Sequence, residues 1–201
     1  MRRSRSLDAA YFEELYGREI DPWSLETSEY EAGKYQRTLA ALGDERSKRA
    51  LELGCSIGVL TRKLAAHCDR LIATDISKIA LERAGTRCAD LPNVELMLVR
   101  SARDSFVGEF DLIVLSEVVY FWDDADLAAV AEAILRTLEP GGRLLLVHWL
   151  GETDYPRSGD DAVAALEDVL SGTFSVERSE RHDAYRLDLW RRLAGLRSPS
   201  R

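Results

Sequence analysis

The feature that most constrains the fold and ligands of this chain is an apolar strand that runs into a glycine turn. A second strand follows it and ends in an acidic residue. The first strand and its turn are Leu51–Gly58, and the second strand ends at Asp75. A carboxylate about 20 residues beyond such a turn is where the hydroxyl pair of a ribose is bound. A glycine turn after a strand is by itself often only a tight connection. Its spacing to Asp75 favours a nucleoside site.

The residues between the two glycines narrow the choice of nucleoside. Residues 55–57 separate Gly54 from Gly58, so the middle glycine that lets backbone approach a pyrophosphate is missing. This argues against a nicotinamide dinucleotide. Glu52 would lie unfavourably beside a pyrophosphate, but it can receive an ammonium group. S-adenosylmethionine has a ribose and a zwitterionic amino acid but no phosphate, so it suits these positions.

Length and composition bound the class of protein. The chain has 201 residues, which favours one domain with a substantial core. The formal charge is −8 and the acidic residues are spread along the chain, so the sequence has no basic stripe of the kind that binds phosphate backbones. We therefore expect no nucleic-acid partner. The oligomeric state stays open.

Cysteine usage and hydropathy indicate the compartment. Cys55, Cys68 and Cys88 form no C-x-x-C pair, a pattern that a reducing compartment tolerates. No run approaches the ~18 apolar residues that span a bilayer, and no apolar segment follows the arginines near the start. We expect a soluble, cytoplasmic protein with no membrane partner. His67 and Cys68 have no second ligand at finger-like spacing, so we also expect no metal.

Short apolar runs alternate with segments of helical period between 49 and 150, which is typical of a parallel sheet covered on both faces. Apolar residues recur every three or four positions from Leu127 to Leu138, and they predict a helix that Pro140-Gly141-Gly142 ends. Ser77 is the predicted N-cap of another helix. The runs predicted as strands are 50–53, 70–74, 94–99, 110–115 and 143–149.

The flanking segments differ from this pattern. Residues 7–42 are rich in aromatic and acidic side chains and predict a two-helix arm broken at Asp21-Pro22. After the core we expect a helix over 160–170 and closing strands over 173–181 and 185–191. The expected division is an N-terminal helical arm over 1–43, an α/β core over 44–193, and a disordered tail over 194–201.

Four motifs in order resemble those of class I S-adenosylmethionine-dependent methyltransferases. They are Glu52–Gly58, Asp75, Phe110-Asp111-Leu112-Ile113-Val114 and Pro140-Gly141-Gly142-Arg143-Leu144. The resemblance spans half of the chain. It implies a single α/β domain with a Rossmann-like, seven-stranded sheet that is mostly parallel and has antiparallel final strands.

The flanks resemble one group within that class. Asp21-Pro22-Trp23, Tyr30-Glu31, Lys34 and Ser116-Glu117-Val118-Val119-Tyr120 are similar to the NodS-type nodulation methyltransferases. Members of that family N-methylate the deacetylated glucosamine end of a chito-oligosaccharide. The resemblance therefore implies an enzyme of oligosaccharide biosynthesis in nodulation.

The resemblance also implies which residues hold the cofactor. The ribose would lie on Asp75, and Trp23 and Tyr30 would belong to the arm over the cofactor. Many class I enzymes carry an acid where Ser101 stands, although a hydroxyl or a backbone carbonyl can also accept the proton of the adenine amine. The implied cofactor-binding set is Trp23, Tyr30, Glu52, Gly54, Cys55, Gly58, Asp75, Ile76, Ser101, Ala102 and Ser116.

The residues that follow the ends of the later strands are candidates for the methyl acceptor site. Ligands of such sheets lie outside the carboxyl ends of the strands, where Glu117, Tyr120 and His148 are expected. Glu117 would bind an acceptor amine as its ammonium form, and His148, with an ordinary pKa near ~6.5, could take the proton. The alternative for Glu117, which the sequence favours less, is an acid at a helix start, and for His148 an equal alternative is a hydrogen-bonded histidine at a strand end.

Aromatic side chains near these positions could stack on a sugar ring. Trp23, Tyr120, Trp149 and Tyr155 are available for this, although clustered aromatic residues are more often part of a core.

The sequence therefore predicts an S-adenosylmethionine-dependent methyltransferase that yields S-adenosylhomocysteine. We expect its substrate to be an amine of a sugar, oligosaccharide or other small molecule. The alternatives are a small-molecule O- or S-methyltransferase and an S-adenosylmethionine-binding module without catalysis.

Overall fold

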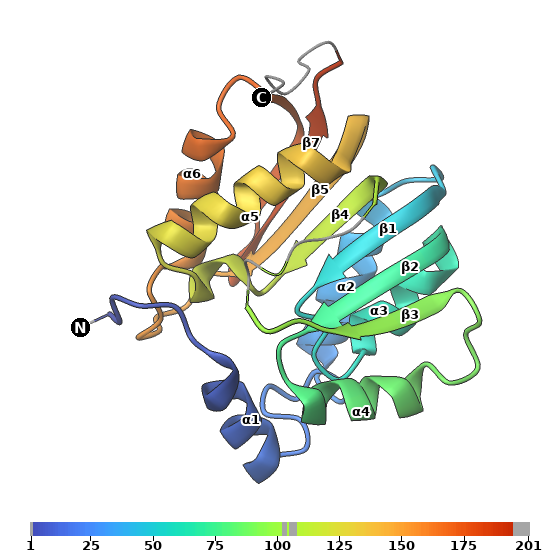
Figure 1. The fold of residues 1–201 in the computed structure, drawn as a ribbon, viewed down its shortest axis with the longest axis vertical. Coiled ribbons are helices and arrows are strands. Elements are labelled where there is room, and N and C mark those ends of the chain that lie inside the picture. Colours follow the sequence, from blue (N-terminus) through green and yellow to red (C-terminus); the bar gives the residue numbers. More distant parts are fainter. Residues whose placement is uncertain (1, 102–103, 105–107, 195–201) are drawn as a thin grey trace. The chain divides into compact units, whose positions relative to one another are not determined.

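The computed structural model describes residues 2–101, 104 and 108–194 of the chain (Figure 1). Its internal contacts divide the chain into two compact units, one of residues 8–101 and one of residues 1–7 with 102–201. The predicted Ala102 lies outside the described residues, as do residues 195–201 of the predicted tail.

The unit of residues 8–101 contains three parallel strands in the order β3-β2-β1. Leu51 pairs with Ile72, and Ala73 pairs with Leu96, so the apolar runs predicted as strands lie side by side. The elements are α1 (Ala9–Arg18), α2 (Glu29–Ala41), β1 (Ser47–Leu53), α3 (Val59–Leu64), the 3-10 helix η1 (Ala65–His67), β2 (Cys68–Asp75), α4 (Lys78–Arg87) and β3 (Val94–Leu98).

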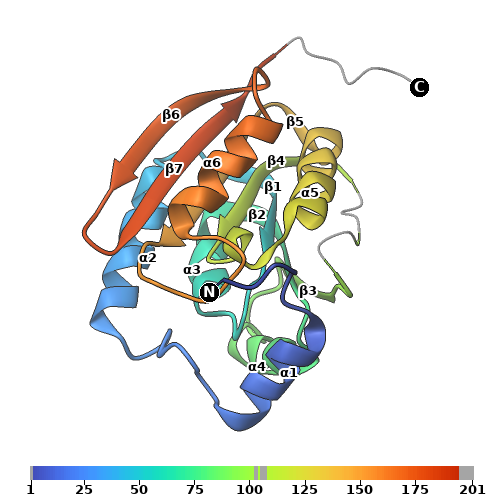
Figure 2. The same ribbon diagram turned by 90° about the vertical axis from the view of Figure 1, so that its left-hand side faces the viewer.

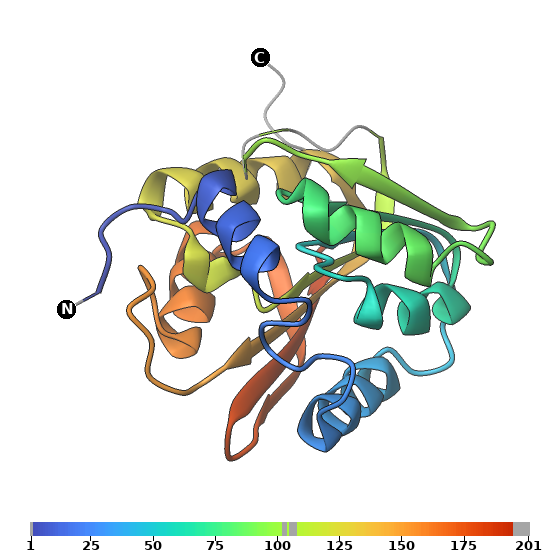
Figure 3. The ribbon, with the colours of Figure 1, turned by 90° about the horizontal axis from the view of Figure 1, so that it is seen from below.

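The helices of this unit contact one another in a row, α2 against α3, α3 against α4, and α4 against α1, and Figure 3 shows α1 beside α4. The two predicted arm helices are present on either side of Asp21-Pro22. The Asp21 carboxylate stabilises the segment between the two helices by accepting hydrogen bonds from the backbone N–H groups of Leu25 and Glu26. Ser77 caps α4, as predicted, through the N–H of Ala80.

The second unit contains strands in the order β4-β5-β7-β6, seen in Figure 2, and α5 contacts α6. β4 and β5 are parallel, whereas β7 is antiparallel to both β5 and β6. The elements are β4 (Phe110–Ser116), the 3-10 helix η2 (Val119–Phe121), α5 (Asp124–Thr137), β5 (Leu138–Trp149), α6 (Gly159–Val169), β6 (Phe174–Arg181) and β7 (Tyr185–Arg192).

The strand order of the whole seven-stranded sheet is β3-β2-β1-β4-β5-β7-β6. This confirms the predicted fold class, a mostly parallel sheet whose final strands are antiparallel. The core consists of fully buried aliphatic side chains on the central strands, among them Leu51, Leu71, Ile113 and Leu145.

The predicted role of Pro140-Gly141-Gly142 was wrong. α5 already ends at Thr137, and the three residues lie inside β5. The pairing of β5 with β4 shifts register there, from Phe110 opposite Leu138 to Leu112 opposite Arg143. Gly141 adopts φ +82°, a left-handed conformation that glycine tolerates, so the segment forms an irregularity in the strand instead of a helix stop.

Candidate functional site

The turn after β1 has a left-handed backbone at three positions. Gly54, Ser56 and Gly58 have φ values of 70°, 53° and 80°. A Cβ at Gly58 would lie 3.0 Å from both the Cα and the Cβ of Ala84 in α4, so glycine also permits the close packing of α4. Ser56 has no such freedom, and a non-glycine residue in this region is a strained position of the kind found at ligand sites.

Asp75 at the end of β2 holds this turn. Its Oδ2 accepts a hydrogen bond from the Ser56 backbone N–H at 2.7 Å, and its Oδ1 accepts one from the Ser77 N–H at 2.8 Å. The carboxylate is buried, and burial raises its pKa to about 6 although both N–H groups act in the opposite direction. A buried carboxylate with lone pairs beyond these two bonds is suited to accept further hydroxyl donors.

Glu52 is another buried carboxylate of this unit. It lies in β1, is 2% exposed, and its Oε2 has no hydrogen-bond partner in the described part of the chain. Burial raises the pKa of Glu52 to about 7, the nearby Thr61 hydroxyl acts in the opposite direction, and the charge of Asp75 adds to the rise. An unsatisfied buried carboxylate oxygen costs free energy unless a donor reaches it. An ammonium group would satisfy it, so the residues present suit the amino acid end and the ribose of S-adenosylmethionine.

Tyr16 of α1 fixes the turn from the arm, a contact that sequence reasoning missed. Its hydroxyl lies 2.5 Å from the Ser56 Oγ, its side chain is buried, and burial raises its pKa well above the ordinary value. Arg83 of α4 donates to the Tyr16 carbonyl at 2.9 Å. The sequence feature that could have indicated the burial of Tyr16 is its i, i+4 spacing from Phe12, which puts both residues on the buried face of α1.

Other predicted cofactor residues of this unit have different surroundings. Cys55 is buried, and burial raises the pKa of its thiol well above the ordinary value, so it lines the turn as an unreactive group. Trp23 is 36% exposed and packs edge-on against Tyr16 at 5.8 Å between ring centroids. Tyr30 is 40% exposed, with the Lys34 ammonium 5.2 Å from its ring centroid. Ile76 is half-buried next to Asp75.

For the remaining predicted cofactor residues, Ser101 and Ser116, the structure shows burial and position in the fold. Ser101 is half-buried outside any helix or strand, and Ser116 is half-buried at the end of β4. The structure brings Ser56, Asp75 and Tyr16 together by direct hydrogen bonds.

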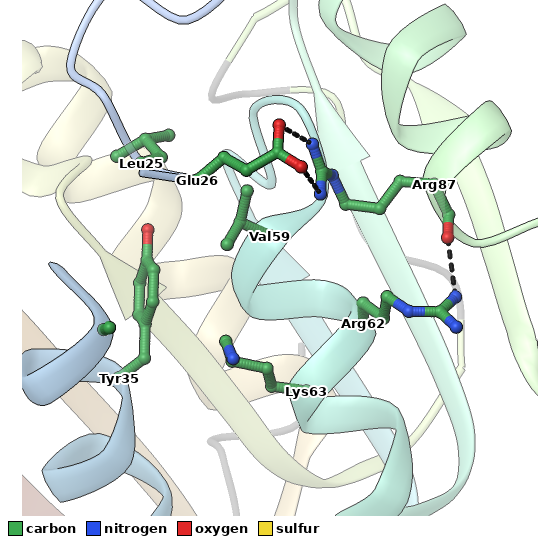
Figure 4. Close-up of a pocket in the computed structure, with 8 residues that line it drawn as sticks. Leu25, Glu26, Tyr35, Val59, Arg62, Lys63 and Arg87 are labelled. Carbon is green, nitrogen blue, oxygen red and sulfur yellow. Dashed lines mark hydrogen bonds and ion pairs between the residues drawn. The ribbon is translucent and has the colours of Figure 1, made fainter. Parts of the chain in front are cut away.

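A pocket lies beside the turn, between α2 and α3 (Figure 4). Arg87 spans it by donating from Nε to the Ile57 carbonyl at 2.9 Å and from its guanidinium to both carboxylate oxygens of Glu26. Arg62 is bound to the Arg87 carbonyl and to Asp90. Because these charges are matched with one another, we assign the pocket to packing of the arm against α3. Its lining residues are Leu25, Glu26, Ala32, Tyr35, Val59, Arg62, Lys63 and Arg87.

In the second unit, Glu117 follows β4 with a left-handed backbone of φ +59°. Its N–H donates to the Val147 carbonyl at 2.8 Å, which ties it to β5. Its Oε2 accepts from the Tyr120 hydroxyl and from the Trp149 backbone N–H, each at 2.8 Å. The structure therefore brings the predicted Glu117 and Tyr120 together in one half-exposed, fixed carboxylate cluster.

His148 lies beneath this cluster and is fully buried. Its Nε2 accepts a hydrogen bond from the Val119 N–H at 3.3 Å, and its ring packs edge-on against Tyr120 at 5.5 Å. A nitrogen that accepts carries no proton, so this bond favours the neutral ring. The arrangement matches a hydrogen-bonded histidine at a strand end more closely than a residue that meets substrate.

No group of three or more His, Cys, Asp or Glu side chains in the described part is arranged to hold a metal ion. None of the helices described in the structure combines the length and the apolar character that crossing a membrane requires.

Comparison with known proteins gives a family match. The family model of nodulation protein S (NodS) matches residues 11–151. Nodulation protein S of Rhizobium tropici is 34% identical over 137 residues, which cover 66% of this chain and 58% of that protein. The protein of the same name from Bradyrhizobium diazoefficiens is 33% identical over 62% of this chain and 61% of its own length. The chain thus spans about three-fifths of these relatives.

Solved structures agree with this match. A Pseudomonas syringae protein, described as a candidate methyltransferase, is 37% identical, covers 81% of this chain and 99% of its own, and superposes with a TM-score of 0.72. The N-methyltransferase NodS of Bradyrhizobium japonicum in complex with S-adenosyl-L-homocysteine has a TM-score of 0.79 at 22% identity, over 92% of this chain and 99% of its own. The latter similarity is evidence for the fold.

Proposed function

This chain belongs to the nodulation protein S (NodS) family, and on that premise we propose that it is an S-adenosylmethionine-dependent N-methyltransferase. The observation that carries the proposal is the pair of buried carboxylates, Glu52 and Asp75, at the ends of neighbouring strands. Both have raised pKa values, and Glu52 has an unsatisfied oxygen. A ligand with an ammonium group and a ribose would satisfy both.

Each residue near the turn has a distinct task in this proposal. Asp75 would accept the ribose hydroxyls while the Ser56 and Ser77 N–H groups hold its orientation. Glu52 would accept the ammonium of the methionine part. When bound, the cofactor would supply a methyl group on a sulfonium: an acceptor lone pair would form a bond to the methyl carbon in line with the breaking C–S bond, and S-adenosylhomocysteine would leave. Positioning supplies most of the acceleration in such a reaction.

For the acceptor we propose an amine of an amino sugar or a deacetylated chito-oligosaccharide. Glu117 would bind the amine, because its carboxylate is half-exposed and is held in one orientation by Tyr120 and Trp149. We propose for His148 a positioning role through Val119, since its Nε2 is engaged there. Proton transfer by His148 remains the alternative role predicted from the sequence.

The proposal extends to the setting of the enzyme. The three cysteines are free and buried, which a reducing cytoplasm preserves. We propose that the protein acts there on an oligosaccharide intermediate of nodulation.

A methyl-transfer assay tests the proposal. The protein is incubated with tritiated S-adenosylmethionine and, in separate reactions, a glucosamine oligosaccharide, its N-acetylated form, a thiol and a carboxylate. We expect transfer to the glucosamine oligosaccharide alone. Transfer to the thiol or the carboxylate would favour another methyltransferase, and cofactor binding without transfer to any acceptor would favour a binding module.

A further inference from the structure

Trp149 stands out as a half-exposed aromatic residue whose backbone meets the Glu117 carboxylate. It is the last residue of β5 and follows the fully buried His148, and successive side chains of a strand point to opposite faces. Its side chain is 38% exposed, whereas its backbone N–H donates to Glu117 Oε2 at 2.8 Å. The same residue thus fixes the carboxylate and presents an indole to solvent.

Gly151 determines where this indole lies. A Cβ built on Gly151 would be 2.0 to 2.5 Å from three carbon atoms of the Trp149 ring, distances that real Cβ atoms do not show. The ring therefore lies directly on the glycine backbone. Gly159, at the far end of the same loop, packs as closely on Trp149, because a Cβ there would be 2.3 Å from the Trp149 carbonyl oxygen.

The loop that joins β5 to α6, residues 150–158, is anchored at both ends. The Arg157 N–H donates to the carbonyl of Tyr120 in the Glu117 cluster at 3.2 Å, and the Leu150 N–H donates to the Ala184 carbonyl before β7 at 2.9 Å. Tyr155 stacks on Tyr120 with 5.5 Å between centroids and 26° between planes. Because the Trp149 indole packs on Gly151 of this anchored loop, the indole loses little conformational freedom when a ligand packs on it.

We propose that Trp149 is the platform on which the pyranose ring of an amino-sugar acceptor stacks while Glu117 binds its amine. The C–H face of a pyranose is apolar and slightly positive, so it packs favourably on the electron-rich face of an indole. An acyclic amine can use the carboxylate but not the ring. The inference rests on the proposed function and adds to it the residue that selects cyclic acceptors.

Two ligands and three variants test the platform. Calorimetry measures binding of a fully deacetylated glucosamine trimer and of ethanolamine, each in the presence of S-adenosylhomocysteine. We expect Trp149→Ala to lower the preference for the trimer over ethanolamine about tenfold, and Trp149→Phe about threefold, since an aromatic contact contributes on this scale. Gly151→Ala should act like Trp149→Ala although it keeps the tryptophan, because its Cβ displaces the ring.

Gly33→Ala is the matched control, since a Cβ there meets no atom within 4 Å and the residue lies within α2. It should bind both ligands as the parent does. Thermal unfolding of every variant checks folding, and Trp149→Phe carries the test if Trp149→Ala does not fold.

The outcomes separate this inference from the proposed function. An unchanged preference in both Trp149→Phe and Gly151→Ala, or a parent protein that does not bind the trimer, would overturn the platform. If the parent binds the trimer through Trp149 but transfers no methyl group to it, the platform stands and the proposed function fails.

Discussion

At the residue scale, the account depends on carboxylates whose surroundings differ. Asp75 and Glu52 are buried and have raised pKa values, so both gain from a ligand that donates hydrogen bonds or a positive charge. Glu117 is half-exposed and is fixed by neutral donors. The first two suit a bound cofactor, and the third suits an acceptor that arrives from water.

Asp75→Asn tests the ribose assignment. The amide keeps the size of the side chain but removes the charge that strengthens hydrogen bonds from hydroxyl groups. We expect affinity for S-adenosylhomocysteine to fall roughly 10- to 100-fold, measured by calorimetry. Asp69→Asn, an exposed residue at the start of the same strand, is the control. Equal affinity in Asp75→Asn and the parent would show that the ribose binds elsewhere.

Tyr16→Phe tests whether the arm holds the turn. The change removes only the hydroxyl that meets Ser56, so we expect a loss of about 1 kcal/mol in the free energy of unfolding and weaker binding of S-adenosylhomocysteine. Ser171→Ala, which removes a hydroxyl from an exposed position of the other unit, should change neither quantity. A Tyr16→Phe protein with parental affinity would limit Tyr16 to packing.

At the scale of elements, buried apolar strands were the most predictable part of the molecule. Runs such as 70–74 and 110–115 lie within the observed β2 and β4, because a strand buried on both faces reads as continuous apolar sequence. The Pro140-Gly141-Gly142 prediction failed because the same residues that stop helices also permit an irregular strand. The bond between Tyr16 and Ser56 could not be read, because it joins residues 40 positions apart.

Arg83 of α4 attaches α1 and the following break to α4, beside a hydrogen bond from the Lys78 N–H to the Glu13 carboxylate and the ion pair of Arg87 with Glu26. The contribution of Arg83 can be tested. Arg83 donates to the carbonyls of Tyr16, Glu19 and Ile20, the last groups of α1 and the start of the break. We expect Arg83→Ala to speed amide hydrogen exchange in α1 and the following break while the exchange of β1 and β2 stays slow.

Arg18→Ala, an exposed position in α1, serves as the control for this experiment. Unchanged exchange of the arm in Arg83→Ala would mean that other contacts hold it.

At the scale of the whole molecule, the two kinds of chemistry belong to different compact units. Glu52, Asp75 and Tyr16 lie in the unit of residues 8–101, and Glu117, Tyr120 and Trp149 lie in the other. The site residues were therefore predictable only as separate motifs. The neighbours that fix these side chains could not be predicted, because they act through backbone groups that side-chain identity does not specify. An example is the Val119 N–H, which donates to His148.

The buried carboxylates predict how stability depends on pH. The folded pKa of Glu52 is raised to about 7, so between about pH 4 and 7 the folded protein keeps a proton that the unfolded chain releases. This contribution to the free energy of unfolding is present at low pH and is lost as pH rises. Glu52→Gln should match the parent near pH 4 and exceed it by about 3 kcal/mol at pH 8.

Denaturant unfolding at several pH values measures this difference, with the exposed Glu82→Gln of α4 as the control. A difference between parent and Glu52→Gln that does not grow with pH would show that Glu52 is ionised without cost.

The central claim is that the methyl group passes from S-adenosylmethionine to a sugar nitrogen. The most direct measurement is NMR of the product after reaction of a deacetylated glucosamine oligosaccharide with S-adenosylmethionine labelled by ¹³C in its methyl group. We predict that the labelled carbon is bonded to the amine nitrogen, and that Glu117→Gln forms this product more slowly. A label on a hydroxyl oxygen, or equal transfer to the N-acetylated oligosaccharide, would contradict the account.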